Sequence, residues 1–266
     1  MEKIANVFAV DDNDTFLAQV NTALKPHFNV LTASSGARMF AMFEKVKPDI
    51  IVLDIEMPGM DGFEVLSRLK GNPEHAGIPV MFLTGVQDAT LEARALSAGV
   101  VDFVEKPFTA PILVNRINLH LNLAEMKRSR RKPMEIPPPE RKTIFAVDDN
   151  DTFLSQMDDA LKNHYNVVTI SSGTKVFELI EKITPHLIVL DIEMPEMDGF
   201  QVLSRLKAEK RLSNIPVIFL SGMQDESMEN RAFSAGVADF IQKPFTTPIL
   251  SNRIHLHIFL RELRKR

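Results

Sequence analysis

Ile50-Ile51-Val52-Leu53-Asp54-Ile55-Glu56-Met57-Pro58 is an apolar run that ends in an acid and a proline turn. The same pattern returns as Leu187-Ile188-Val189-Leu190-Asp191-Ile192-Glu193-Met194-Pro195. Asp54 and Asp191 are 191 − 54 = 137 positions apart. A second pair of segments, Val10 to Leu17 and Val147 to Leu154, and a third, Lys106-Pro107-Phe108 and Lys243-Pro244-Phe245, have the same offset. The chain therefore contains one unit twice, with no insertion between these landmarks.

The length of the repeat indicates two domains. Solenoid repeats are about 20–50 residues long, so a period of 137 residues indicates a domain duplication instead. We predict one domain over residues 1–127, a basic and proline-rich linker over 128–141, and a second domain over 142–266. Pro137-Pro138-Pro139 favours an extended, stiff spacer.

Composition excludes several classes of site. The chain has no cysteine, which excludes disulfides, thiolate metal sites and cysteine nucleophiles. A net charge of −4 gives no electrostatic case for direct nucleic-acid binding. The basic run before the proline-rich segment is expected to be the solvated end of a helix, with a patch for nucleic acid or an acidic partner as the alternative. Without a signal peptide or a long apolar run, we expect a cytoplasmic protein with no membrane partner.

Short apolar runs alternate with helical patterns along each copy, which predicts a parallel sheet covered on both faces. The second copy follows the same order from Ile144 to about Leu263. In the first copy we predict strands at Ile4–Val10, Phe28–Thr32, Ile50–Leu53, Pro79–Leu83 and Val101–Val104, and helices at Thr15–Lys25, Ser35–Val46, Gly62–Lys70, Asp88–Ala98 and Pro111–Met126. Asp14 and Asp61 are the expected N-caps of the first and third helices.

Polar residues follow four of these strands in the first copy. They are Asp11, Asp12, Asp54, Thr84 and Lys106. Ligands of open parallel sheets bind beyond the carboxyl ends of the strands, where the strand order reverses. These side chains are therefore expected to converge at one edge of the sheet.

Three carboxylates brought together repel one another unless a positive group is present. Lys106 is one candidate, and a hard divalent cation is the other, because oxygen ligands suit Mg²⁺ or Mn²⁺. Zinc is disfavoured, since no sulfur ligand or paired histidine lies nearby. Asp54 is then placed to accept a phosphoryl group as an acyl phosphate, with a lysine to stabilise the transferring charge. His120 and His257 are expected to pack on the last helix of each copy rather than to bind metal.

Both halves resemble receiver domains of two-component response regulators. Four motifs carry the resemblance: the acidic pair after the first strand, Asp-x-x-Met-Pro-x-Met-Asp-Gly after the third, Thr/Ser-Gly after the fourth and Lys-Pro-Phe after the fifth. The resemblance implies two flavodoxin-like (βα)5 folds, each a doubly wound parallel sheet of five strands. It also implies cis bonds before Pro107 and Pro244.

The resemblance further implies a role for each matching residue. The implied phosphoacceptors are Asp54 and Asp191, and the implied Mg²⁺ ligands are these two with Asp11, Asp12, Asp148, Asp149 and the backbone carbonyls of Glu56 and Glu193. Thr84 and Ser221 are the implied switch hydroxyls, Lys106 and Lys243 the phosphoryl-contacting lysines, and Phe103 and Phe240 the switch aromatics. The two phenylalanines depart from the tyrosine that is usual in the family, so contacts that need a tyrosine oxygen are not expected.

The function implied is a response regulator or phosphorelay protein that accepts phosphoryl groups from a histidine kinase or histidine phosphotransfer protein. It would act by switching a protein-binding or self-association face, and it would not be an enzyme. One alternative is a regulatory tandem-receiver module of a larger diguanylate-cyclase-like or phosphodiesterase-like protein. In another, one receiver acts as a phosphate sink or a scaffold. A nucleotide or phosphate hydrolase is disfavoured because the chain has no glycine-rich phosphate loop.

Overall fold

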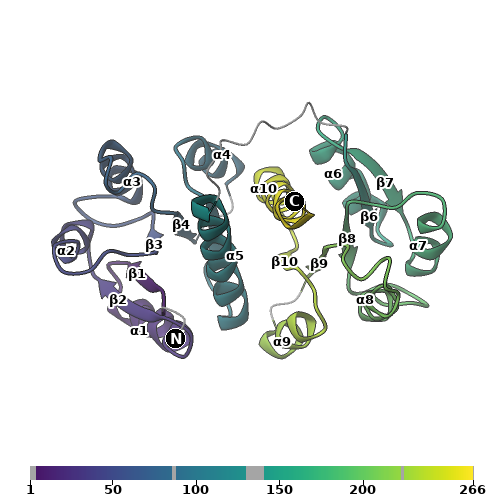
Figure 1. Ribbon diagram of the computed structural model, residues 1–266, viewed down its shortest axis with the longest axis horizontal. Coiled ribbons are helices and arrows are strands. Elements are labelled where there is room, and N and C mark those ends of the chain that lie inside the picture. The colour runs from purple at the N-terminus through teal and green to yellow at the C-terminus, as the bar shows by residue number, and fades with distance from the viewer. Residues whose placement is uncertain (1–3, 86–87, 130–140, 223–224, 266) are drawn as a thin grey trace. The chain divides into compact units, whose positions relative to one another are not determined.

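A computed structural model describes residues 4–85, 88–129, 141–222 and 225–265. The chain divides into two compact units, Met1–Arg130 and Arg131–Arg266. Within these described ranges, each unit contains five strands and five helices in strict alternation (Figure 1). Most of the predicted linker lies outside the described residues, and its predicted extended form stays a prediction.

In the first unit the five helices separate five short strands, as the alternating pattern predicts. The elements are β1 (Asn6–Val10), α1 (Asp14–Leu24), β2 (Asn29–Ala33), α2 (Gly36–Met42), β3 (Ile50–Asp54), α3 (Gly62–Gly71), β4 (Val80–Thr84), α4 (Ala89–Ser97), β5 (Asp102–Glu105) and α5 (Ala110–Ser129). All strand pairs are parallel, and the sheet order is β2-β1-β3-β4-β5.

The second unit repeats this arrangement. Its elements are β6 (Thr143–Val147), α6 (Asp151–Leu161), β7 (Asn166–Ile170), α7 (Gly173–Ile180), β8 (Leu187–Asp191), α8 (Gly199–Ala208), β9 (Val217–Ser221), α9 (Glu226–Ser234), β10 (Asp239–Gln242) and α10 (Thr247–Lys265). The sheet order is β10-β9-β8-β6-β7, again with parallel pairs throughout. The predicted flavodoxin-like doubly wound fold is confirmed for both units.

The two faces of the first sheet bury separate sets of side chains. On β3, Ile50 and Val52 pack with residues of α1 and α5, whereas Ile51 and Leu53 pack with residues of α2, α3 and α4. This alternation follows from the two-residue period of a strand. Because both faces are covered, all five residues of β3 are buried and the strand reads as a continuous apolar run.

Several predicted helix limits were wrong, most of them by one residue. The N-cap of α1 is Asn13 rather than Asp14, because the Asn13 side chain accepts the Phe16 backbone N–H at 3.1 Å. Helix α2 ends at Met42 instead of Val46, and a hydrogen-bonded turn follows, in which the Lys45 N–H donates to the Met42 carbonyl. Helix α5 continues to Ser129, three residues beyond the predicted end.

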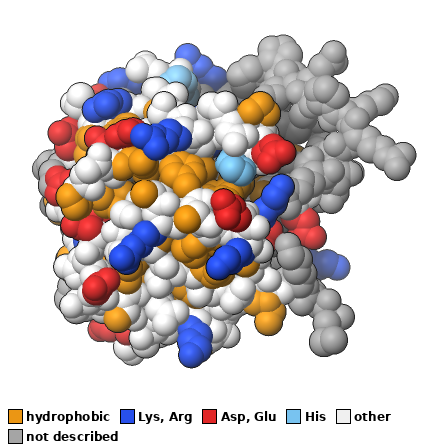
Figure 2. All heavy atoms as spheres, turned by 90° about the vertical axis from the view of Figure 1, so that its left-hand side faces the viewer, with side chains coloured by type: hydrophobic (Ala, Val, Ile, Leu, Met, Phe, Trp, Pro, Cys, Tyr) orange, Lys and Arg blue, Asp and Glu red, His pale blue; other side chains and the backbone are white. Residues whose placement is uncertain are grey.

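Apolar side chains around α2 are only partly covered. Phe40, Met42, Phe43 and Val46 pack against the core from its edge while retaining some exposure. Figure 2 shows a band of hydrophobic side chains on the side of the first unit where α2 and α3 lie in Figure 1. Surface apolar groups of this kind are common in globular proteins.

Candidate functional site

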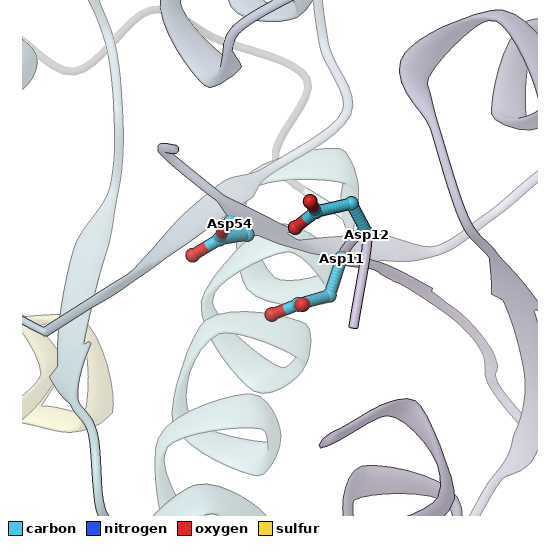
Figure 3. Close-up of side chains that lie close together, drawn as sticks. All are labelled: Asp11, Asp12 and Asp54. Atoms are coloured by element: carbon cyan, nitrogen blue, oxygen red, sulfur yellow. The ribbon is translucent and has the colours of Figure 1, made fainter. Parts of the chain in front are cut away.

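Three acids meet at the carboxyl edge of the first sheet. Asp11 and Asp12 follow β1, and Asp54 ends β3, which pairs with β1 at the point where the strand order reverses. Their side chains lie close together (Figure 3), with one oxygen of each within 4.8 Å of the others. Asp148, Asp149 and Asp191 form the same cluster in the second unit. The predicted convergence of the acids is confirmed in both copies.

Local contacts fix two of these acids. The Asp11 carboxylate accepts the Asn13 backbone N–H at 2.9 Å, which holds the first acid of the pair in the turn before α1. Gly62 at the start of α3 approaches the backbone of Asp54 so closely that a Cβ atom there would lie 2.6 Å from the Asp54 carbonyl oxygen. Glycine at this position of the motif therefore allows α3 to pack directly under the acceptor.

A lysine that directly follows the last strand of each unit, β5 or β10, completes each cluster. The Lys106 ammonium donates to Asp11 at 2.6 Å and to Asp54 at 2.7 Å. In the second unit Lys243 lies 2.6 Å from Asp148 and 2.8 Å from Asp191. The Lys106 N–H donates to the Thr84 carbonyl, and the bond to Pro107 is cis, as is the bond between Lys243 and Pro244. Both expected cis bonds are therefore present.

Burial and charge act against each other at the acceptor. Burial raises the pKa of the Asp54 carboxyl, and the hydrogen bond and positive charge of Lys106 oppose this without cancelling it. The pKa of Asp191 is raised for the same reason, against the opposing effect of Lys243. Burial alone would lower the pKa of Lys106, but its hydrogen bonds to Asp11 and Asp54 raise it overall. The lysine is thus cationic at neutral pH.

The donor set fits a hard divalent cation. Each cluster offers three carboxylates, and a single lysine leaves a formal excess of negative charge. Oxygen-only donors with one solvent-exposed member, Asp12 or Asp149, suit Mg²⁺, which keeps several waters. Asp11, Asp12 and Asp54 would hold the ion in the first unit, and Asp148, Asp149 and Asp191 in the second.

The remaining predicted residues lie around the same edge. A cavity of 210 Å³ is lined by Asp54, Glu56, Thr84 and Lys106 among others. Thr84 and Ser221 are buried at the ends of β4 and β9. Glu56 and Glu193 are exposed in the loops after β3 and β8. The Phe103 ring is buried with its centroid 6.2 Å from that of Phe82, and Phe240 is also buried.

The sequence interpretation missed two sets of contacts. In the first, the buried His120 lies 2.9 Å from Asp102, whose other oxygen accepts the Phe103 N–H at 2.7 Å. His257 and Asp239 repeat this pair at 3.0 Å. In the second, the ring of Phe16 in the first turn of α1 lies against the ammonium group of Lys106. Both sets recur at the repeat offset, and that recurrence was the signal available in the sequence.

Comparison with known proteins agrees with this geometry. The family model of the response regulator receiver domain matches residues 7–118 and again residues 144–255. The chain belongs to the response regulator receiver domain family. Both units are therefore receivers of two-component signalling.

Relatives of these receivers include regulators with longer chains. Response regulator PleD of Caulobacter vibrioides is 26% identical, with 96% of this chain and 59% of PleD aligned. Cyclic di-GMP phosphodiesterase response regulator RpfG of Xanthomonas campestris is 34% identical over 47% of this chain and 34% of its own length. The chain thus spans less than two thirds of these relatives.

A solved structure is also similar to one unit. Chemotaxis protein CheY4 of Vibrio cholerae matches with a TM-score of 0.42 and 26% identity, covering 44% of this chain and 98% of that protein.

Among the described residues, no helix is both long and apolar enough to cross a membrane.

Proposed function

We propose that Asp54 and Asp191 each accept a phosphoryl group from a phosphohistidine donor in the presence of Mg²⁺, and that the chain signals through the resulting change in its receivers. The observation that carries this proposal is the three-acid cluster with a lysine bonded to its central carboxylate, built twice with matching geometry.

The carboxylate of Asp54 is the nucleophile. One of its oxygens forms the new bond to phosphorus, the P–N bond of the donor breaks, and the donor imidazole leaves with the electron pair and takes a proton from solvent. Lys106 offsets negative charge on the transferring group from a position it already occupies. The bound cation would supply further charge neutralisation at the phosphoryl oxygens. Mn²⁺ is expected to substitute for Mg²⁺, because it takes the same oxygen ligands.

The buried hydroxyl and the aromatic residue give the acyl phosphate a way to change the fold. Thr84 lines the cavity next to Asp54 and is expected to donate to a phosphoryl oxygen, and Ser221 to act likewise in the second unit. Movement of Thr84 toward the phosphoryl group would vacate space near Phe103 on the adjacent strand β5. Phosphorylation then acts only through its preference for the shifted state.

The partners follow from this chemistry. A histidine kinase or a histidine phosphotransfer protein is the expected donor, and a downstream protein or a second receiver is the expected target. Neither nucleic acid nor membrane is needed by the site, and we place the protein in the cytoplasm. Within this proposal the receivers only transfer phosphate to and from themselves, so the chain is not counted as an enzyme.

A second candidate follows from the comparisons. PleD aligns with almost the whole of this chain but is much longer, so the two receivers would serve as the regulatory part of a larger protein related to such regulators. In that case an output domain outside this chain would carry the activity. A variant of the proposal makes one receiver a phosphate sink or a scaffold for the other. Both units have a complete set of reactive groups, which gives no support to this variant.

Acetyl phosphate with Mg²⁺ tests the proposal directly. Intact-mass spectrometry of the 266-residue chain should show up to two added phosphoryl groups, one in each single variant Asp54→Asn and Asp191→Asn, and none in the double variant. Omitting Mg²⁺ should remove both. If the double variant were labelled as extensively as the wild-type chain, the assignment of the acceptors would be contradicted.

A further inference from the structure

Besides its two carboxylate partners, each site lysine has an aromatic ring next to its ammonium group. The Lys106 ammonium is 4.1 Å from the centroid of the Phe16 ring, while it is bonded to Asp11 and Asp54. In the second unit the Lys243 ammonium is 4.3 Å from the Phe153 ring centroid. A cation this close to a ring face is attracted by the negative face of the π system.

Each ring is itself held in place. Phe16 is in the first turn of α1, and its N–H donates to the N-cap Asn13 at 3.1 Å. Its ring meets the Phe108 ring edge-on, with centroids 5.4 Å apart and an interplanar angle of 85°. Phe108 belongs to the Lys-Pro-Phe segment, so the ring connects the start of α1 to the turn that carries the lysine. Phe153 and Phe245 also lie side by side, with centroids 6.0 Å apart, but their rings are tilted at 37° instead of edge-on.

The ring differs from the two carboxylates in one respect. When Asp54 becomes an acyl phosphate, its own carboxylate charge is lost and negative charge appears on the phosphoryl oxygens instead. The contact that Lys106 makes with Asp54 therefore changes during transfer. The Phe16 ring takes no part in the bond changes, so it can hold the ammonium beside the acceptor while the contact with the Asp54 carboxylate is exchanged for one with the phosphoryl oxygens.

A lysine side chain also loses much rotamer freedom when it is ordered. A fixed ring on one side limits the positions open to the ammonium and favours those beside Asp54. On the basis of the proposed function, we propose that Phe16 and Phe153 are positioning residues for phosphoryl transfer, each holding its site lysine beside the acceptor carboxylate through the ring face.

Small phosphoryl reagents separate this role from partner docking. Phe16 also lines a cavity of 570 Å³ with Gln19, Lys106 and Phe108, which is open to solvent. A substitution at Phe16 could therefore alter contact with a protein donor as well. Beryllofluoride with Mg²⁺ and acetyl phosphate with Mg²⁺ avoid that complication, because neither needs a protein surface.

The experiment uses the full chain in an Asp191→Asn background, so that only the first site responds. Phe16→Leu keeps apolar volume but removes the ring face, Phe16→Tyr keeps the ring, and Phe40→Leu removes a ring on α2, away from the site. We expect Phe16→Leu to weaken beryllofluoride affinity and slow acetyl-phosphate labelling by about fivefold, the order of a partly desolvated cation–π contact. Phe16→Tyr and Phe40→Leu should stay close to the parent.

A spectroscopic measurement accompanies the kinetics. The ring current of Phe16 should shift the proton signals of the Lys106 methylene next to the ammonium, and Phe16→Leu should remove that shift while Phe16→Tyr retains it. Phe153→Leu and Phe153→Tyr in an Asp54→Asn background repeat the experiment on the second unit, and so provide the answer if Phe16→Leu does not fold.

The outcomes are distinguishable. A leucine variant that matches the parent in affinity and labelling would overturn the positioning role. Equal losses in the leucine and tyrosine variants would also overturn it, because they would show packing rather than the ring face at work. A parent that binds no beryllofluoride would instead refute the proposed function, and the positioning role with it.

Discussion

The two receivers share every reactive group, yet they differ in the turns and side chains around those groups. Gly59 in the turn after β3 has a φ of 79°, and its counterpart Glu196 adopts a similar φ of 65°. The second unit therefore places a side chain in the left-handed region, where residues other than glycine are strained. The acid clusters of the two units nevertheless consist of the same residue types in the same arrangement. The comparison shows that the site geometry is set by the strand ends and the lysine, and tolerates variation in the adjoining loop.

A second difference concerns the hydroxyl after the fourth strand. Thr84 in the first unit is replaced by Ser221 in the second, and both are buried. The site lysines also differ in exposure, since 22% of the Lys106 side chain is accessible compared with 10% for Lys243. The two sites are thus expected to perform the same reaction with different rates and lifetimes.

The largest expected effect comes from removing one lysine at a time. Lys106→Ala should slow labelling of Asp54 by acetyl phosphate by roughly 100-fold, the order found when one group that stabilises transition-state charge is removed. Labelling of Asp191 should continue at its normal rate, and Lys243→Ala should give the reverse. Peptide mapping after labelling measures each site. Equal slowing of both acceptors by one substitution would show that the sites are not independent.

The raised pKa of each acceptor predicts how stability depends on pH without a metal. A carboxyl whose pKa is higher in the folded state contributes stability below its unfolded pKa, and this is lost as pH rises through the folded pKa. At neutral pH and in the presence of a chelator, Asp54→Asn should therefore stabilise the first unit and Asp191→Asn the second. The difference from wild type should shrink as the pH falls through the raised folded pKa of the acceptor, and it should be absent below the ordinary pKa range of aspartate.

Hydrogen exchange read by mass spectrometry assigns the change to the correct unit. Addition of Mg²⁺ should reduce the difference in stability between each asparagine variant and wild type, because the cation binds the wild-type carboxylates and offsets their repulsion. An asparagine variant that is less stable than wild type at neutral pH, with a gap that widens as pH rises, would contradict the sign of the shift.

Exchanging the turn residues is expected to have a smaller effect. Gly59→Glu should destabilise the first unit by about 1 kcal/mol, because it introduces a left-handed non-glycine residue. Glu196→Gly should stabilise the second unit by less than this, since the added backbone freedom of glycine in the unfolded chain offsets part of the gain. Urea unfolding followed by hydrogen exchange in each unit measures both changes. Phosphoacceptor activity should be unaffected, and a lost activity would show that the turn shapes the site.

The smallest expected effect is the hydroxyl exchange. Thr84→Ser and Ser221→Thr remove or add one methyl group in a buried position, worth about 0.8 kcal/mol or roughly fourfold in an equilibrium. We expect the lifetimes of the two acyl phosphates to move toward each other by no more than this factor. Separate dephosphorylation time courses for the two sites provide the measurement. A change in acyl-phosphate lifetime far beyond fourfold, about the effect of one methyl group, in either variant would mean that the hydroxyl has a larger part in hydrolysis.

The sequence was sufficient for the fold and for the positions of the acids and lysines. Apolar runs such as Ile50–Leu53 have one structural solution in an alternating pattern, and residues directly after such strands must share one edge of the sheet. Contacts that depend on side-chain direction were not predictable in this way. The choice of Asn13 over Asp14 as N-cap depends on which side-chain oxygen accepts the Phe16 backbone N–H, and the sequence permits both.

The end of α2 and the buried histidine pairs show the same limit. Ser35 to Val46 has helical spacing throughout, but the chain turns after Met42 and tertiary packing decides where. His120 was expected to pack on its helix, and it does, but its partner Asp102 on β5 is known only once α5 lies against the sheet. The ring of Phe16 over Lys106 likewise needs the two segments to be brought together.

The most direct test of the two-site account is to trap the acyl phosphate chemically. Borohydride reduction of the chain after reaction with acetyl phosphate and Mg²⁺ converts an aspartyl phosphate to homoserine, and peptide mass mapping locates the converted residue. The account predicts homoserine at positions 54 and 191 and at no other aspartate. Conversion at one of these positions only, or at a different acid, would contradict the claim that both units contain a working phosphoacceptor.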